Sequence, residues 1–152
     1  AWTHKQKNKA WGAWAAIAVL IALLSADESA SIHEMLTKPV TELLGIESGV
    51  AFVTAWAIPI TIIFLVIALF FAKFYWNLPR KYQMIFAGAV ILFFAGAIGM
   101  EWFSAHYVYA NDFTYDQRYM LYAGIEETLE MSGAILALYG LLSYLKHESW
   151  RT

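Results

Sequence analysis

The chain has 152 residues, of which 61% are apolar and only 14% are charged, whereas a typical soluble domain has about 25% charged residues. This composition is that of a membrane protein, and a net charge of −2 without a long basic run excludes nucleic acid as a partner. Because there is no cysteine, iron–sulfur clusters and covalent haem attachment are excluded, and any metal must be held by oxygen and imidazole ligands.

Four apolar runs follow one another along the chain, at about residues 10–25, 50–74, 84–103 and 119–145. The last three are long enough to cross about 30 Å of hydrocarbon as helices. The first run is short for a span. Because Lys5, Lys7 and Lys9 precede it, a cleaved signal peptide is a competing interpretation.

The segment between the first two runs, at about residues 29–44, has apolar residues at helical spacing. This pattern predicts an amphipathic helix that lies on the outer membrane surface. We expect Pro39 to bend or interrupt the helix and Gly45 to end it. The fold class predicted from the whole pattern is all-α: an integral membrane four-helix bundle with this additional amphipathic helix, in a single domain spanning residues 1–152.

The basic residues predict the orientation of the spans. Only Lys38 and Arg118 lie on one side, and the other eight flank the ends that must share the opposite side: Lys5, Lys7, Lys9, Lys73, Arg80, Lys81, Lys146 and Arg151. Basic loops stay in the cytoplasm. We therefore predict a multi-pass protein of the bacterial inner membrane with both termini in the cytoplasm.

Acidic residues gather in or near the outer half of the predicted bundle, where eleven of the twelve lie. Three of them, Glu126, Glu127 and Glu130, lie inside the fourth apolar run. A carboxylate near the bilayer centre costs roughly 2.5 to 3.5 kcal/mol on insertion scales. A metal, protons or cationic partners must compensate three such groups, so an intramembrane polar site is the leading functional hypothesis.

Helical spacing relates these acids to small residues. Glu130 shares a helix face with Glu126, four residues away, or with Glu127, three residues away. The Glu126/Glu130 face continues through small residues, at Gly133, Ala137 and Gly140, which let another helix approach closely. We expect the same of three glycines in the third run, Gly88, Gly96 and Gly99.

Further carboxylates and imidazoles lie at the outer ends of the other runs, at Asp27, Glu28, His33, Glu34, Glu101 and His106. In helical bundles, inward Glu and His side chains build di-iron and di-manganese sites. This ligand set suits a divalent metal: iron, manganese, zinc or calcium. It departs from the soluble di-metal proteins, because Glu-x-x-Glu replaces one of their two Glu-x-x-His pairs.

We predict Glu130, Glu127 and Glu101 as the first metal ligands, completed by His33 and His106. Glu34 or Glu28 would support these ligands or act as a general base, and Asp27 and Glu126 complete the candidate set.

Each candidate also has a purely structural interpretation. The acids and His33 near the end of the first run fit a solvated helix end and the surface of the amphipathic helix. In this interpretation the Glu101 side chain extends to the outer lipid headgroups, and His106 is an interfacial residue without a role in a site. Glu126 would reach water if the fourth span began deeper. Glu130 together with Glu127 is the hardest to explain in this way.

Two motifs carry a resemblance. Ser25-x-Asp27-Glu28-x-x-x-Ile32-His33-Glu34 and Glu126-Glu127-x-x-Glu130-Met131-x-Gly133, with Gly99-x-Glu101 between them, resemble a group of uncharacterised bacterial multi-spanning membrane proteins. The resemblance covers the chain from the first run to about Leu145. It implies a small four-span protein with an acid- and histidine-rich site, and it implies no reaction.

Three functions remain open at this stage. The first is a membrane metalloprotein, including a redox or hydrolytic enzyme. The second is an accessory or assembly subunit of a larger membrane complex, in which a partner's Arg or Lys pairs with the carboxylates. The third is proton or cation translocation through Glu130 and Glu127, which at this size requires a homo-oligomer.

Overall fold

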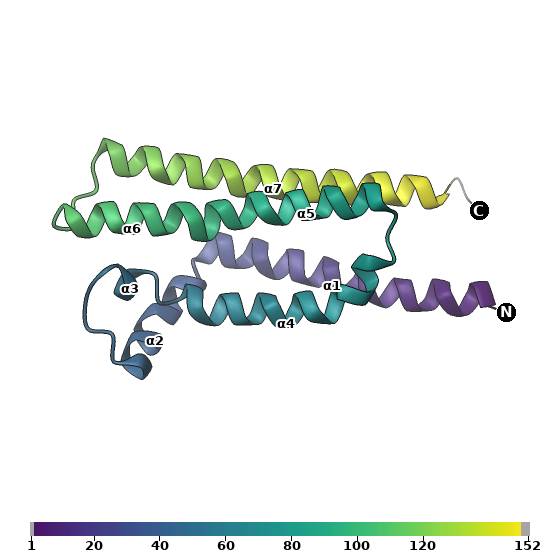
Figure 1. Ribbon diagram of the computed structural model, residues 1–152, viewed down its shortest axis with the longest axis horizontal. Helices are drawn as coiled ribbons and strands as arrows, with labels where there is room; N and C mark the ends of the chain where they lie inside the picture. The colour runs from purple at the N-terminus through teal and green to yellow at the C-terminus, as the bar shows by residue number, and fades with distance from the viewer. Residues whose placement is uncertain (1, 150–152) are drawn as a thin grey trace. The chain divides into compact units, whose positions relative to one another are not determined.

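The computed structural model describes the backbone of residues 2–149, while the side chains of residues 2–11, 13, 14, 28, 29, 148 and 149 lie outside its described part. Within these residues the chain is all helical, as predicted, and has no strand. The elements in chain order (Figure 1) are α1 (Trp2–Ala30), the 3₁₀-helix η1 (His33–Leu36), α2 (Thr37–Leu44), α3 (Val50–Val53), α4 (Ala57–Trp76), α5 (Arg80–Phe94), the π-helix η2 (Ala95–Met100), α6 (Glu101–Ala110) and α7 (Gln117–Ser149).

The chain divides into two compact units. Unit 1 comprises Ala1–Glu47 and Ala55–Phe74, and it therefore holds α1, η1, α2 and nearly all of α4. Unit 2 comprises Ser48–Thr54 and Tyr75–Thr152, and its main elements are α5, η2, α6 and α7.

Three helical segments among the described residues are long and apolar enough to cross a membrane: Ala57–Trp76, Arg80–Ala110 and Gln117–His147. The apolar part of α1 is shorter, at Ala15–Asp27. The predicted second span begins seven residues late, because Val50–Val53 form the separate short helix α3. Pro59 lies in the first turn of α4. Proline is tolerated there, because the N–H groups of the first turn make no hydrogen bond within the helix.

The segment predicted as one amphipathic helix is divided in the structure. Helix α1 continues to Ala30, and the chain then turns at Ser31 before η1 and α2 follow without a break. Pro39 lies in the first turn of α2, so the interruption comes ahead of it and the helix continues through it. Gly45 ends α2, as predicted, in a left-handed conformation with φ 66° and donates its N–H to the Thr41 carbonyl.

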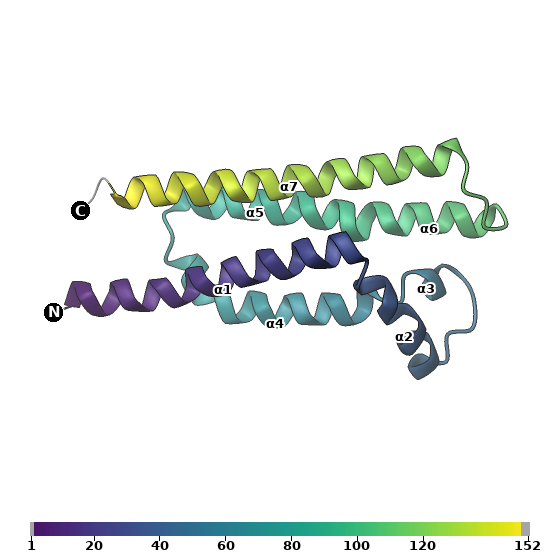
Figure 2. The ribbon, with the colours of Figure 1, turned by 180° about the vertical axis from the view of Figure 1, so that it is seen from behind.

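Unit 2 is an antiparallel helix pair, in which η2 and the flanking α5 and α6 run along α7 (Figures 1 and 2). Close approaches occur at glycines. A Cβ on Gly133 would lie 2.8 Å from the Ala89 carbonyl oxygen, and one on Gly140 would lie 2.8 Å from a methyl of Ile85. The predicted close packing at these two glycines is confirmed.

The glycines of the third run differ from one another. A Cβ on Gly96 would lie 2.7 Å from the Glu126 carbonyl oxygen, so this close approach is confirmed. A Cβ on Gly88 would be in ordinary van der Waals contact, 3.4 Å from a methyl of Leu136. The prediction is wrong for Gly99: the nearest atom to an added Cβ is the Phe94 carbonyl oxygen of the preceding turn, at 4.0 Å, and no atom of α7 lies within this distance. At 100° per residue Gly99 lies well away from the line through Ala89, Phe93 and Gly96.

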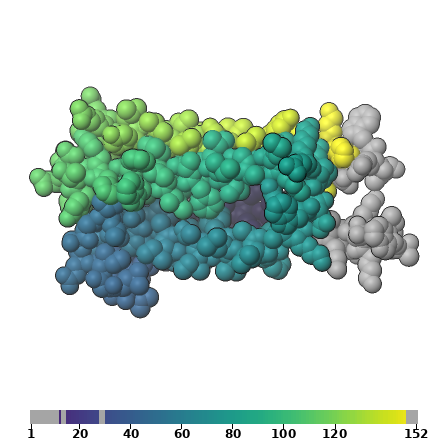
Figure 3. Space-filling view, in the orientation of Figure 1, coloured from purple at the N-terminus to yellow at the C-terminus, as the bar shows by residue number. Residues whose placement is uncertain are grey.

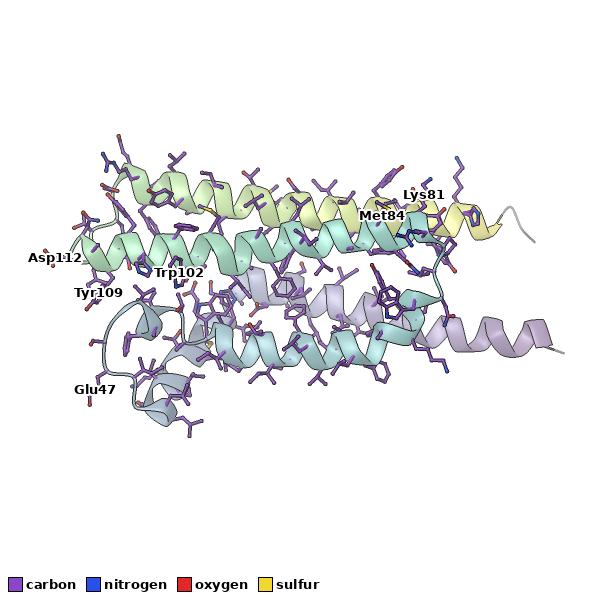
Figure 4. All side chains as sticks on the ribbon, viewed as in Figure 1. Glu47, Lys81, Met84, Trp102, Tyr109 and Asp112 are labelled. Atoms are coloured by element: carbon purple, nitrogen blue, oxygen red, sulfur yellow. The ribbon has the colours of Figure 1, made fainter. Side chains whose placement is uncertain are left out.

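Asp116 holds the start of α7. Its Oδ1 accepts hydrogen bonds from the N–H groups of Arg118, at 2.9 Å, and Tyr119, at 3.1 Å, and its Oδ2 accepts one from the Tyr107 hydroxyl at 2.6 Å. This carboxylate is an N-cap that also ties α6 to α7. The turn between α6 and α7, which contains Asp112, lies at one end of the helix pair, and Lys81 of α5 lies at the other end (Figure 4).

The glycine contacts give the first prediction. Gly133→Ala should destabilise the protein by about 1–3 kcal/mol, because the added methyl meets backbone atoms of α5 that cannot move freely. Gly124→Ala, in the same helix but with nothing within 4 Å of the added atom, should stabilise it by about 0.4–1 kcal/mol. Thermal unfolding in detergent, followed by circular dichroism, measures both. Equal effects of the two changes would contradict the close approach.

The second prediction concerns acid. The hydrogen bond from Tyr107, followed by those from the backbone of α7, holds the pKa of Asp116 below its ordinary value. Its stabilising effect is therefore complete above the unfolded carboxyl value of about 3.9 and is lost as the pH falls through the lower folded value. Asp116→Asn keeps the capping oxygen and should weaken the dependence of the unfolding temperature on acid. An unchanged acid dependence would contradict this role.

Candidate functional site

Glu126 and Glu130 lie on the face of α7 that packs against η2. Besides the Glu126 carbonyl, a Cβ on Gly96 would meet the Glu130 side chain, at 2.8 Å from its Cγ, and the Glu130 backbone nitrogen at 3.2 Å. Both glutamates are half-buried, while Glu127 is exposed on another side of the helix. The predicted packing of the Glu126/Glu130 face is thus confirmed, and Glu127 points away from this contact.

Glu130 is far from either end of its helix. It follows Gln117 by 13 residues, which corresponds to about 20 Å along the axis. It precedes His147, the end of the candidate span, by 17 residues, or about 26 Å. The Glu130 side chain therefore contacts Gly96 far from both ends of the helix pair.

The element opposite these carboxylates is a π-helix. The N–H of Glu101 donates to the Gly96 carbonyl five residues back and to the Ile98 carbonyl three residues back, and so bypasses the Ala97 carbonyl four residues back. A short π-helical segment inside an α-helix is rare and is frequent at functional sites. The π-helix also adds one residue to a helical turn, so the residues after η2 lie on other sides of the helix than they would in an uninterrupted α-helix.

The additional residue in η2 determines where Glu101 lies. The side of α5 that faces α7 carries Ala89, Phe93 and Gly96 at steps of three to four residues. In α6, which follows η2, the buried residues are Ser104, Ala105 and Val108. Glu101 precedes Ser104 by three residues and Ala105 by four, so it lies on the same side of the helix. An uninterrupted α-helix would carry Met100 at this place. Glu101 is half-buried.

His106 belongs to a different side of α6. It is exposed, and its ring lies over Trp102, four residues earlier, with the ring centroids 4.3 Å apart. Trp102 is itself 49% exposed. This placement agrees with the interfacial interpretation of His106, since amphipathic rings gather at membrane–water boundaries.

In unit 1, Asp27 and His33 form a tight pair across the turn that follows α1. The His33 backbone N–H donates to Asp27 Oδ1 at 2.8 Å, and Nδ1 of the ring lies 2.9 Å from Oδ2. The imidazole also lies against the Trp56 ring, with centroids 4.4 Å apart. Ser31, between the pair, has a positive φ of 46°, which is uncommon for a residue other than glycine. The carboxylate thus closes the turn.

The structure divides the predicted ligands between the two units. Asp27, Glu28, His33 and Glu34 lie in unit 1, and Glu101, His106, Glu126, Glu127 and Glu130 lie in unit 2. Glu34 is exposed, and the side chain of Glu28 lies outside the described part. Among the described side chains there is no group of three or more His, Asp and Glu residues that is close enough to hold a metal ion.

Sequence reasoning missed two features of these sites. The π-helix was not predicted, although the small residues of Ala95-Gly96-Ala97 and Gly99 mark a stretch with little side-chain packing to enforce α-helical spacing. The contact of Trp56 with His33 was also not predicted. No pattern in the sequence indicates it, because the position of Trp56 depends on the turn between α3 and α4.

Comparison with known proteins adds the family. A family model described as a domain of unknown function, DUF8692, matches residues 1–145, which agrees with the resemblance to an uncharacterised family. No curated protein and no solved structure matches the chain.

The pair in unit 1 gives the third prediction. Asp27→Ala removes both hydrogen bonds to His33 and should destabilise the protein by about 1–2 kcal/mol, at roughly 1 kcal/mol for each bond. Glu34→Ala changes an exposed acid of the same segment and should have little effect. Thermal unfolding of both variants in the same detergent makes the comparison. Equal losses would mean that the Asp27–His33 pair does not hold the turn.

Proposed function

The chain belongs to the DUF8692 family, and we propose that it is an integral membrane protein that binds a hard divalent cation, calcium or manganese, at Glu126 and Glu130. The observation that carries this proposal is the position of the two carboxylates. They lie on the packed face of α7, where Gly96 of a π-helix lets the Glu130 side chain pass between the helices.

The membrane arrangement has four spans. Three are the long apolar segments of α4, α5–η2–α6 and α7, and the fourth is α1. The apolar part of α1 is short, but the helix has 29 residues, or about 43 Å, which exceeds the roughly 30 Å of hydrocarbon. The excess of Lys and Arg at one end supports a cytoplasmic position for both termini, and the proposed membrane is the bacterial inner membrane.

Packing supports a site built on Glu126 and Glu130. A carboxylate that points toward lipid gains nothing to offset its cost in hydrocarbon, whereas one on a helix–helix face has polar neighbours within reach. Glu127 is exposed on α7 and therefore serves as a natural control. The π-helix adds one residue between Gly96 and the half-buried Glu101.

The available ligands favour a hard cation. In unit 2 the groups at the contact are carboxylates and the backbone carbonyls of η2, one of which the Glu101 N–H bypasses. His106 lies over Trp102 on another side of α6, and His33 is held by Asp27 in unit 1. Oxygen ligands without imidazole suit calcium or manganese better than zinc or iron.

Proton or cation transfer is the second candidate, and the spacing of Glu126 and Glu130 favours it. Two carboxyls one helical turn apart can share a proton, and Glu130 lies near the middle of a candidate span. This function uses the same two residues and differs from the first in that the proton or cation is passed on and does not stay bound.

The fourth prediction tests the cation. Protein purified in mild detergent without chelators should carry about one equivalent of calcium or manganese, held by its carboxylates. Glu130→Gln, which keeps the shape and removes the charge, should lose it, and so should Glu126→Gln. The matched control Glu127→Gln should keep it. Elemental analysis by mass spectrometry measures all four samples after dialysis.

Two outcomes would contradict cation binding at this site. Wild-type protein without either metal, even after incubation with both, would leave protons as the compensating charge and would favour the second candidate. Equal loss of metal from Glu127→Gln and Glu130→Gln would place the ion outside the packed face.

A further inference from the structure

The segment between α1 and α4 carries an apolar stripe on its outside. Because η1 and α2 follow each other without a break, their residues form one continuous helical surface. Ile32 and Met35 are three residues apart, as one 3₁₀ turn requires, and Met35, Pro39 and Leu43 follow at intervals of four, as an α-helix requires. These four side chains, the apolar stripe, lie in one line.

The side chains of the stripe are exposed. Leu43 is 84% exposed, Met35 is 73% exposed and Ile32 is 49% exposed, and Pro39 is also exposed. In contrast, α2 buries Thr41, which is 3% exposed. A helix of a soluble protein does the opposite and turns its apolar side inward.

Charged residues of α2 occupy a separate side. Lys38 and Glu42, four residues apart, are both exposed, and neither lies in line with Leu43. At 100° per residue, Leu43 stands about 100° from Glu42 and about 140° from Lys38 around the helix. The outward surface of α2 is thus half apolar and half charged. This is the pattern of a helix that lies in a membrane interface.

Continuity of the chain identifies what covers the stripe. The apolar part of α1 ends at Asp27, five residues before Ile32, and the apolar helix α4 begins at Ala57. The segment therefore leaves one apolar helix and returns to another, and it stays near the membrane surface at which both helices end. Figure 3 shows atoms of this segment, in blue, at the surface of the molecule, and Glu47 projects outward near its end (Figure 4).

We propose that the apolar stripe inserts into the boundary between headgroups and acyl chains of the membrane that the helices span, with zwitterionic lipid as its partner. Between residues 31 and 49 the chain has Glu34, Glu42 and Glu47 against Lys38, a net charge of −2, which repels anionic headgroups. The proposal rests on the membrane insertion proposed above and is independent of cation binding.

The fifth prediction uses the absence of cysteine from the chain, which lets each variant carry a single nitroxide label. Leu43→Cys and Met35→Cys place the label on the stripe, and Glu42→Cys places it on the charged side. Leu69→Cys, on the 78% exposed Leu69 of α4, reports whether the protein is inserted at all. The proteins are reconstituted in phosphatidylcholine vesicles, and collisions with oxygen and with a water-soluble nickel chelate are measured.

Oxygen should exceed nickel collisions severalfold at positions 35, 43 and 69, while nickel should dominate at position 42. Nickel-dominated labels at positions 35 and 43, with a lipid-exposed label at 69, would overturn the stripe proposal and leave membrane insertion intact. A water-exposed label at 69 would overturn both. An immobile, spin-coupled label at 43 would show a second copy of the chain on the stripe and would also overturn the lipid assignment.

Discussion

The close approach of α7 to the rod formed by α5, η2 and α6 is the constraint on which the candidate site depends. At Gly133 and Gly96 the facing atoms leave no room for a methyl group, so backbone atoms of the two helices come close there, and at Gly96 the Glu130 side chain lies in the contact as well. In a membrane, where lipid removes the hydrophobic drive between helices, such contacts are a main source of association energy. They also fix the rotation of α7, because the helix can satisfy them in only one orientation. That orientation turns Glu126 and Glu130 inward.

The π-helix complements this constraint on the other side of the contact. If the helix from α5 to α6 were strictly α-helical, its contact line would still run through Phe93 and Gly96, and Met100 would then face α7. The additional residue in η2 moves Glu101 into that position, and Ser104 and Val108 of α6 are buried. In the same segment the Glu101 N–H donates to the carbonyls of Gly96 and Ile98. The proposed cation would offset the charge of Glu126 and Glu130 on the packed face of α7.

Much of this arrangement follows from the sequence because it is periodic. The helices, the packed faces at Gly133 and Gly140 and the C-cap at Gly45 were all predictable from spacing and residue type. Features that depend on a change of period were not. The π-helix altered the face of Glu101, and the turn before α4 brought Trp56 to His33. Glu127 illustrates the remaining ambiguity: three- and four-residue spacings both place an acid beside Glu130, and only the helix contact distinguishes them.

X-ray absorption spectroscopy of the purified protein loaded with manganese tests the central claim most directly. The account predicts a first shell of oxygen atoms alone, without the outer-shell scattering of imidazole, and its loss in Glu130→Gln but not in Glu127→Gln. An imidazole signature would contradict it, because it would place His33 or His106 at the metal. A spectrum of hydrated manganese in the wild-type protein would show that the carboxylates of α7 do not bind this cation.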